Sequence, residues 1–325
     1  MFPQLALIAL GLGLLLVGGT GLIRGASAVA TRTGVPPLII GLTVVAFGTS
    51  TPELMVTVLG ALEGQPQIAY GNVVGSNIAN LGLVLGCAAL VTPMLIQGQV
   101  IRREVPLLLL GTSVLVVMSL DNVLRGASAM LDRADGLILI LLFGIFIYVT
   151  VGDVRRRRED PLVTSAELLP VSLKANGWLR DLAFVLAGIL ALGLGGEVTL
   201  SAGAALADVL GVEPALIGLF VIAIGTSLPE LVTSIVAAFR KEPDLCVGNV
   251  VGSNLVNGLF ILPVGAVLHP IPIPDHGLSD LVVSLAFTAF LVPVFFIGNS
   301  RLGRPIGALL LISYGAYLIL RTGLS

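Results

Sequence analysis

Two glutamates, Glu53 and Glu230, lie within long apolar stretches of the sequence. A charged side chain at the centre of a bilayer costs at least about 2.5–3.5 kcal/mol. No Lys or Arg lies in the core of either stretch to neutralise the carboxylate. We therefore expect each carboxylate to be protonated, to be hydrated in a cavity or to bind a cation. A neutral glutamic acid bonded to nearby hydroxyl groups is the alternative, but it would have to arise twice.

A proline precedes each glutamate, in GTSTPE (48–53) and GTSLPE (225–230). Because proline has no N–H group and its ring clashes with the carbonyl four residues earlier, Pro52 frees the carbonyl of Gly48, and Pro229 repeats the arrangement. Freed carbonyls at membrane depth are tolerated where they are buried in protein or line a wet cavity. A simple kink is the alternative interpretation. The carbonyls that we expect to face an ion are those of Ala46–Thr49 and Ala223–Thr226.

A second pair of matched segments, GNVVGSNIAN (71–80) and GNVVGSNLVN (248–257), supplies amide and hydroxyl groups. A spacing of four residues places three of them on one face of a helix in each segment. Hydrogen bonding between packed helices is the alternative interpretation, above all for the first residue of each stripe. Asn77 and Asn254 point elsewhere, and we expect them to cap unwound backbone. The two stripes are Asn72, Ser76 and Asn80, then Asn249, Ser253 and Asn257.

All of these groups are oxygen donors, which suit Ca²⁺ and Na⁺. Cys87 and Cys246 lie in apolar runs and are expected to fill the core, so a zinc or copper site is disfavoured. We expect no cofactor. Two carboxylates neutralise one Ca²⁺ or about two Na⁺. The two ions would then compete for one site, and competition combined with alternating access yields exchange.

The elements that position these groups are predicted to be membrane helices. The chain has 325 residues, of which 56% are hydrophobic and 11% charged, and a mean hydropathy of +1.06. A soluble domain carries about 25% charged residues, and a net charge of −2 offers no basic face to a nucleic acid. Long apolar runs without alternation indicate helices and exclude outer-membrane strands. The ten predicted spans are residues 3–23, 36–60, 68–92, 104–120, 135–153, 181–205, 214–239, 245–268, 279–298 and 304–320.

The distribution of basic residues predicts the orientation of these spans. With the N-terminus outside, the inside loops hold 14 of the 17 Lys and Arg residues. We expect a multi-pass protein of the plasma (inner) membrane with both termini outside. The polar stretch 154–180 is then a cytoplasmic linker between two five-helix halves, 1–153 and 181–325. Arg155–Arg158 are expected to set the topology, with contact to anionic lipid as the alternative. The first span has no basic residue before it, so we expect a retained helix and not a signal peptide.

The chain contains an internal repeat. The segment 41–86 aligns with the segment 218–263 without a gap, with 21 identities in 46 positions. Because five helices are an odd number, the second copy should cross the membrane in the opposite sense. Glu63-Gly64 in the first copy becomes Arg240-Lys241 in the second, as expected for a loop that has moved to the cytoplasmic side. Inverted repeats with interrupted helices and a midplane site are typical of transporters.

The paired motifs resemble the alpha-repeats of the calcium/cation antiporter superfamily, specifically its sodium/calcium exchanger branch. The resemblance implies ten helices and a central ion site between the second, third, seventh and eighth spans. It also implies that the first helix of each half, two helices in all, slides against the other eight. The motifs that carry it are GTSTPEL (48–54), GTSLPEL (225–231) and the two Asn-containing segments described above.

The resemblance also implies a role for each residue of the site. Glu53 and Glu230 would be acidic ligands shared by Ca²⁺ and Na⁺, and Thr49 and Thr226 would give backbone carbonyls. Asn80 would occupy the centre of the third span. The residues that would line flanking Na⁺ sites are Ser50, Ser227, Ser76 and Ser253.

Asn257 stands where some members of the superfamily carry Asp, and the GNxxE pattern of its proton-coupled members is absent. We therefore predict an antiporter that exchanges Na⁺ for Ca²⁺, with exchange against H⁺ or a K⁺-dependent mode at the same site as alternatives. A channel and an intramembrane hydrolase with Ser50 or Ser227 as nucleophile are disfavoured. The only histidines, His269 and His276, lie in a Pro-rich outer loop, out of reach for a catalytic base. Because the site is complete in one chain, we expect a functional monomer.

Overall fold

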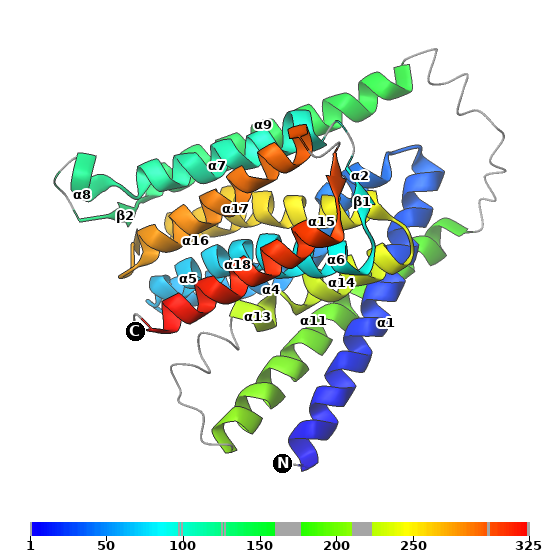
Figure 1. The fold of residues 1–325 in the computed structure, drawn as a ribbon, viewed down its shortest axis with the longest axis horizontal. Coiled ribbons are helices and arrows are strands. Elements are labelled where there is room, and N and C mark those ends of the chain that lie inside the picture. The colour runs from blue at the N-terminus through cyan, green and yellow to red at the C-terminus, as the bar shows by residue number, and fades with distance from the viewer. Residues whose placement is uncertain are drawn as a thin grey trace.

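The computed structural model describes residues 2–159, 177–209 and 223–323, apart from residues 97, 99, 125, 127, 298 and 299. Helices make up almost all of these ranges, as the all-α prediction requires (Figure 1). Two pairs of very short antiparallel strands tie loops together. They are β1 (Met94–Leu95) with β4 (Arg301–Leu302), and β2 (Met130–Leu131) with β3 (Ile271–Pro272).

The helices fall into two series, in which η marks a π-helical turn. The first series is α1 (Phe2–Thr33), α2 (Pro37–Ile40), η1 (Gly41–Val45), α3 (Ala46–Thr49), α4 (Thr51–Leu62), α5 (Pro66–Ala79), η2 (Asn80–Val84), α6 (Leu85–Val91), η3 (Val100–Glu104), α7 (Val105–Met118), α8 (Asp121–Leu124) and α9 (Arg133–Glu159). The second series is α11 (Trp178–Val209), α13 (Ala223–Thr226), α14 (Leu228–Phe239), α15 (Pro243–Val256), η6 (Asn257–Ile261), α16 (Leu262–Leu268), α17 (Gly277–Ile297) and α18 (Arg304–Gly323).

Seven described helices are long and apolar enough to cross a membrane, or eight if the bent pair 37–49 and 51–62 is one span. The predicted span 104–120 lies on α7, which has only 14 residues after the turn η3. The first part of the predicted span 214–239 lies outside the described residues, and so does most of the predicted linker. The structure therefore describes a helical chain with many candidate spans.

The first helix is longer than predicted. The predicted span 3–23 ends before the basic residue Arg24, but α1 continues to Thr33. Arg24 lies over the ring of Phe184, 5.0 Å from its centroid, and Arg32 forms an ion pair with Asp181. Because these contacts accommodate both basic residues, neither ends the helix. The helix ends at Gly34, whose φ of +64° suits glycine.

Helices α1 and α11 pack side by side and extend beyond the rest of the molecule (Figure 1). The two backbones approach closely at glycines. A Cβ atom at Gly18 would lie 2.8 Å from the backbone nitrogen of Leu192, and one at Gly25 would lie 2.8 Å from that of Val185. Side chains at these positions would force the helices apart. The glycines on the facing sides of α1 and α11 therefore allow these two helices to pack closely against each other.

The two repeated segments fold alike. The bounds of α3, α4, α5, η2 and α6 recur at the matching positions of the repeat in α13, α14, α15, η6 and α16, from Ala46 against Ala223 to Val91 against Leu268. The spans made by α5–α6 and α15–α16 are the most buried, with 78% and 83% of their apolar windows inside the protein. They form the centre of the molecule, and the stripes of amide and hydroxyl groups lie on them.

Candidate ion-binding site

Each repeated segment breaks its helix directly before the glutamate. Ser50 separates α3 from α4 with φ −82° and ψ 11°, and Ser227 separates α13 from α14 with φ −84° and ψ 4°. The helical axes on either side of Ser50 differ by 47°. Pro52 lies in the first turn of the new helix, where its missing N–H group leaves no gap in the hydrogen bonding. The predicted interruption is present.

The break places both glutamates in the first turn of a helix, Glu53 in α4 and Glu230 in α14. The N-terminal end of a helix carries partial positive charge from unpaired backbone N–H groups, which stabilises an acidic side chain. Both side chains are completely buried. The two carboxylates lie close enough to each other to repel. A cation between them would remove this repulsion.

The carboxylate of Glu230 accepts hydrogen bonds from two hydroxyl groups. Ser50 Oγ donates to Glu230 Oε1 at 3.0 Å, and Ser253 Oγ donates to the same oxygen at 3.4 Å. Oxygen Oε2 has no hydrogen-bond partner. Since Ser50 belongs to the first segment, the glutamate of one segment is held partly by the other.

The carboxylate of Glu53 is less well satisfied. Hydroxyl groups of Ser76 and Thr226 lie beside it, but neither carboxylate oxygen makes a hydrogen bond. Its backbone carbonyl accepts a hydrogen bond from Asn72 Nδ2 at 3.2 Å. A buried polar atom without a partner is costly unless something else compensates it. Together with Glu230 Oε2, three carboxylate oxygens are therefore available to a cation.

The hydroxyl groups next to the breaks make contacts between the two segments. Thr49 Oγ1 donates to Asn249 Oδ1 at 3.0 Å and lies 3.4 Å from Ser253 Oγ. Conversely, Thr226 Oγ1 of the second segment lies 3.2 Å from Ser76 Oγ of the first segment. The break of each segment thus packs on the Asn-containing helix of the other. One site is assembled from residues that are distant in the sequence.

Asn80 and Asn257 begin the π-helical turns η2 and η6, and both are completely buried. Asn80 Nδ2 donates to Asn254 Oδ1 at 3.0 Å, while Asn80 Oδ1 has no partner. Neither the nitrogen nor the oxygen of the Asn257 side-chain amide has a hydrogen-bond partner. These wide turns interrupt the α-helical hydrogen bonding, and such turns are frequent at functional sites.

The backbone carbonyls predicted to face an ion are partly engaged. The carbonyl of Ala46 accepts the N–H group of Ser50 at 2.9 Å, and the Thr49 hydroxyl, which donates to Asn249, lies 3.3 Å from it. The matching carbonyl belongs to Ala223, the first residue of the described range 223–323.

The first residue of each stripe serves the alternative role considered above. Asn72 Nδ2 reaches Glu53 O and Thr57 Oγ1 on α4, and Asn249 Nδ2 donates to Ser234 Oγ on α14 at 3.1 Å. The sequence analysis missed Thr57 and Ser234. They occupy matching positions of the repeat, one helical turn after the glutamates, so the repeat could have revealed them.

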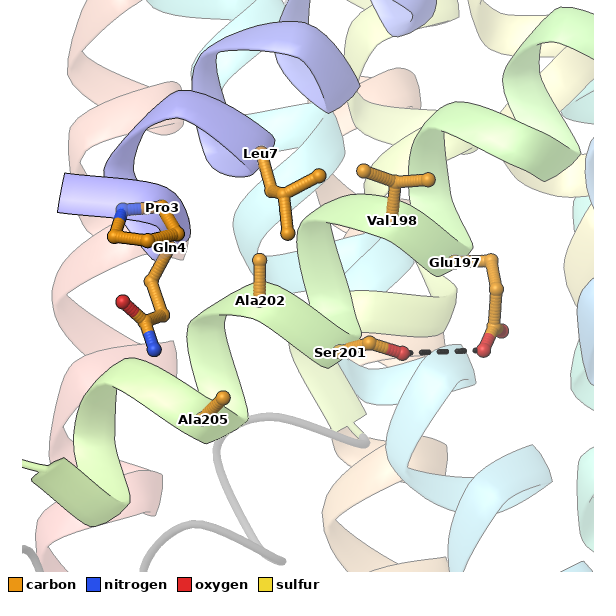
Figure 2. A pocket seen from close by; sticks show the side chains of 8 residues that line it. All are labelled: Pro3, Gln4, Leu7, Glu197, Val198, Ser201, Ala202 and Ala205. Atoms are coloured by element: carbon orange, nitrogen blue, oxygen red, sulfur yellow. Dashed lines mark hydrogen bonds between the residues drawn. The ribbon is translucent and has the colours of Figure 1, made fainter. Parts of the chain in front are cut away.

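Glu104 and Glu197 also lie within predicted spans. Glu104 is buried and forms an ion pair with Arg103, which also pairs with Asp153. Glu197 is exposed on α11, where Ser201 Oγ donates to its Oε1 at 3.2 Å. It lines a mostly apolar pocket of about 320 Å³ between the start of α1 and the end of α11 (Figure 2). None of the predicted site residues lines this pocket.

The chain matches the family model described as "Sodium/calcium exchanger protein" over residues 3–152 and 181–323. It is 37% identical to the putative antiporter CaxA of Alkalimonas amylolytica, over 95% of this chain and 96% of that protein. It is 34% identical to the inner membrane protein YrbG of Escherichia coli, over 95% of this chain and 94% of that protein.

A solved structure of the sodium-calcium exchanger NCX_Mj, soaked with 2.5 mM Na⁺ and 0.1 mM Ca²⁺, is also similar. The TM-score is 0.82, the sequence identity is 27%, and the match covers 98% of each chain. Together with the apolar helices, this similarity shows a polytopic α-helical membrane fold.

Proposed function

The chain belongs to the sodium/calcium exchanger family, a family of transporters and not of enzymes, and from this premise we propose that it exchanges Na⁺ for Ca²⁺ across the membrane. The observation that carries the proposal is the set of three buried carboxylate oxygens without a hydrogen-bond donor. They come from Glu53 and Glu230, one in each segment. Such a set favours a cation as the transported substrate.

The charge of this set supports exchange. Two carboxylates balance one Ca²⁺ or two Na⁺, so the two substrates compete for one position. Asn257 adds oxygen but no charge. The surrounding ligands are hard oxygen donors, which both cations accept. The proposed ligands are the carboxylates of Glu53 and Glu230, the backbone carbonyls near Ala46, Thr49, Ala223 and Thr226, the hydroxyls of Ser50, Ser227, Ser76 and Ser253, and the amides of Asn80 and Asn257.

Alternating access completes the proposed mechanism. Helix α1 packs along α14, whereas the matching helices α11 and α4 are barely in contact. Met55 and Leu59 on α4 are accordingly 56% and 48% exposed, while the matching Val232 and Val236 on α14 are half-buried. We infer that the site opens along α4 in this conformation and along α14 in the other.

The membrane arrangement follows from the same proposal. We propose ten spans in two inverted five-helix halves, with both termini outside, the 154–180 linker in the cytoplasm and the chain in the inner membrane. One relative is named as an inner membrane protein. The end of α4 would then face outside, so this conformation would be open to the outside. Because both segments contribute to one site, a monomer would suffice for transport.

The direct test is ⁴⁵Ca²⁺ uptake by purified protein in proteoliposomes loaded with Na⁺ and diluted into Na⁺-free medium. We expect uptake that requires internal Na⁺, fails in K⁺-loaded vesicles and survives a proton ionophore. Uptake that follows a pH gradient would instead identify exchange against H⁺. Absence of Ca²⁺ flux under every gradient would overturn the proposal.

A further inference from the structure

Asn77 and Asn254 lie against each other between the two central helices α5 and α15. They occupy matching positions in the segments GNVVGSNIAN and GNVVGSNLVN, so they are equivalent residues of the repeat. Asn254 Nδ2 donates to the backbone carbonyl of Asn77 at 3.0 Å, and Asn77 Nδ2 donates to that of Asn254 at 3.5 Å. Both side chains are buried, with 6% of Asn77 and 1% of Asn254 exposed.

These contacts determine the directions in which the amide oxygen and the NH₂ group of Asn254 and of Asn80 point. A backbone carbonyl can only accept, so Asn254 must turn its NH₂ group toward Asn77 O. Its Oδ1 atom then faces Asn80 and can only accept. Asn80 must therefore turn its own NH₂ group toward Asn254, at 3.0 Å. The remaining atom of the Asn80 amide is its oxygen, which has no partner.

Asn80, the first residue of η2, continues the face of α5 that carries the proposed site. Ser76, one helical turn earlier on the same face, contacts Thr226 and lies beside Glu53. An amide with the opposite orientation would present NH₂ donors to a cation and repel it. The chain of hydrogen bonds from Asn77 O through Asn254 therefore gives Asn80 the orientation that a cation requires.

The equivalent chain is incomplete in the other direction. Asn77 Nδ2 reaches Asn254 O only at 3.5 Å, and Asn77 Oδ1 has no partner. Asn257, the counterpart of Asn80, has no partner at either side-chain atom. No hydrogen bond among the described residues fixes the orientation of its amide.

We propose that Asn254 is a positioning residue that holds the Asn80 amide with its oxygen toward the transported cation, and that Asn77 does not do this for Asn257. The inference rests on the proposed function, since it takes Asn80 as a ligand. It adds a residue outside the ligand set and a difference between the two halves.

The first test compares Asn254→Leu with the matched variant Asn77→Leu. Leucine has nearly the size of asparagine but no hydrogen-bonding group. We expect Asn254→Leu to weaken equilibrium ⁴⁵Ca²⁺ binding by the purified full-length protein about tenfold, since one hydrogen bond to a ligand is lost. Asn77→Leu should weaken it less than about threefold. Equal effects would overturn the proposal, and a shared elution volume in gel filtration controls for folding.

The second test separates positioning from packing. Aspartate has two equivalent oxygens and no N–H group, so in an Asn80→Asp background residue 80 has no hydrogen bond to Asn254 to lose and its orientation no longer matters. We expect Asn254→Leu to change Ca²⁺ binding less than about twofold in that background. An undiminished effect would assign Asn254 a packing role only.

Failure of the inference can be told from failure of the proposed function. If the unmodified protein neither binds Ca²⁺ nor transports it against Na⁺, the proposed function is wrong and the inference falls with it. If the unmodified protein does both but the two asparagine variants behave alike, the exchanger remains and only the role of Asn254 is overturned.

Discussion

The two repeated segments carry nearly the same polar residues but satisfy them differently. Glu230 accepts hydrogen bonds from Ser50 and Ser253, whereas Glu53 accepts none at its carboxylate. The amide of Asn80 is held by a neighbour, whereas that of Asn257 is not. Matched residues of the two segments are therefore satisfied unequally. Glu53 and Asn257 together have four polar side-chain atoms without a hydrogen-bond partner, whereas Glu230 and Asn80 together have two.

The two repeated segments also differ in how other helices cover them. Helix α1 packs along α14. Ser27 Oγ on α1 also donates a hydrogen bond to Oε1 of Glu242, which follows α14 in the chain, at 3.1 Å. The residue that matches Glu242 in the first segment is Gln65. On α4 the equivalent face remains exposed at Met55. Helix α1 therefore covers α14 in the second segment, while the matching face of α4 in the first segment is left uncovered.

The largest effect is expected from removing either carboxylate. Glu53→Gln and Glu230→Gln should each lower Na⁺-dependent ⁴⁵Ca²⁺ uptake by more than about 100-fold, because each removes half of the negative charge that balances the cation. The amide keeps the shape of the side chain, so expression should be retained. Glu63→Gln, at the exposed end of α4, serves as a control. Full transport in either site variant would show that the two glutamates do not share the cation.

A smaller effect should follow from the hydroxyl group that connects the two halves. Ser50→Ala removes the donor that lies 3.0 Å from Glu230 and a proposed Na⁺ ligand. Because hydrogen bonds to charged groups contribute about 1.5–3 kcal/mol, we expect the KM for Na⁺ to rise at least about tenfold. Thr51→Ala, whose hydroxyl bonds to the carbonyl of Phe47 on an exposed face, is the matched control. Equal KM values in the two variants would contradict the role of Ser50.

The comparison of the two central asparagines is sharpened by adding a charge. Asn257→Asp introduces a third carboxyl group at a position where no hydrogen bond is broken. We expect about tenfold tighter Ca²⁺ binding at alkaline pH and a new loss of binding in acid, because the added carboxyl group then takes up a proton. Binding measured by isothermal titration calorimetry across pH checks this. An unchanged pH profile would mean that position 257 does not contribute to the charge of the site.

The smallest effect concerns the helix that covers α14. Ser27→Ala removes the hydrogen bond to Glu242, which should shift the balance of conformations by about two- to fivefold toward the one in which α4 is covered. In a background without Cys87 and Cys246, the labelling rate of a Met55→Cys variant by a membrane-impermeant thiol reagent reports the exposure of α4. A slower rate in the Ser27→Ala protein is expected. An equal or faster labelling rate would contradict the proposal that the hydrogen bond between Ser27 and Glu242 favours the conformation in which α14 is covered.

Several features of this protein follow from its sequence alone. The cost of a charge in a bilayer identified Glu53 and Glu230, and the chemistry of proline placed the helix breaks beside them. The gapless alignment of 41–86 with 218–263 predicted that two segments fold alike, which the helix bounds confirm. These features are local or periodic, so they can be recognised without knowing which helices are neighbours.

Other features depend on the tertiary structure. The extension of α1 to Thr33 depends on Asp181 and Phe184, which pack against its basic residues from another helix. The contacts of Ser50 with Glu230 and of Asn80 with Asn254 join residues 180 and 174 positions apart. Hydrogen bonds of this kind depend on the depth and rotation at which packed helices meet. The repeated sequence therefore determined which polar groups are candidates for the proposed site, while the packing of the helices decided which of them are left without a hydrogen-bond partner.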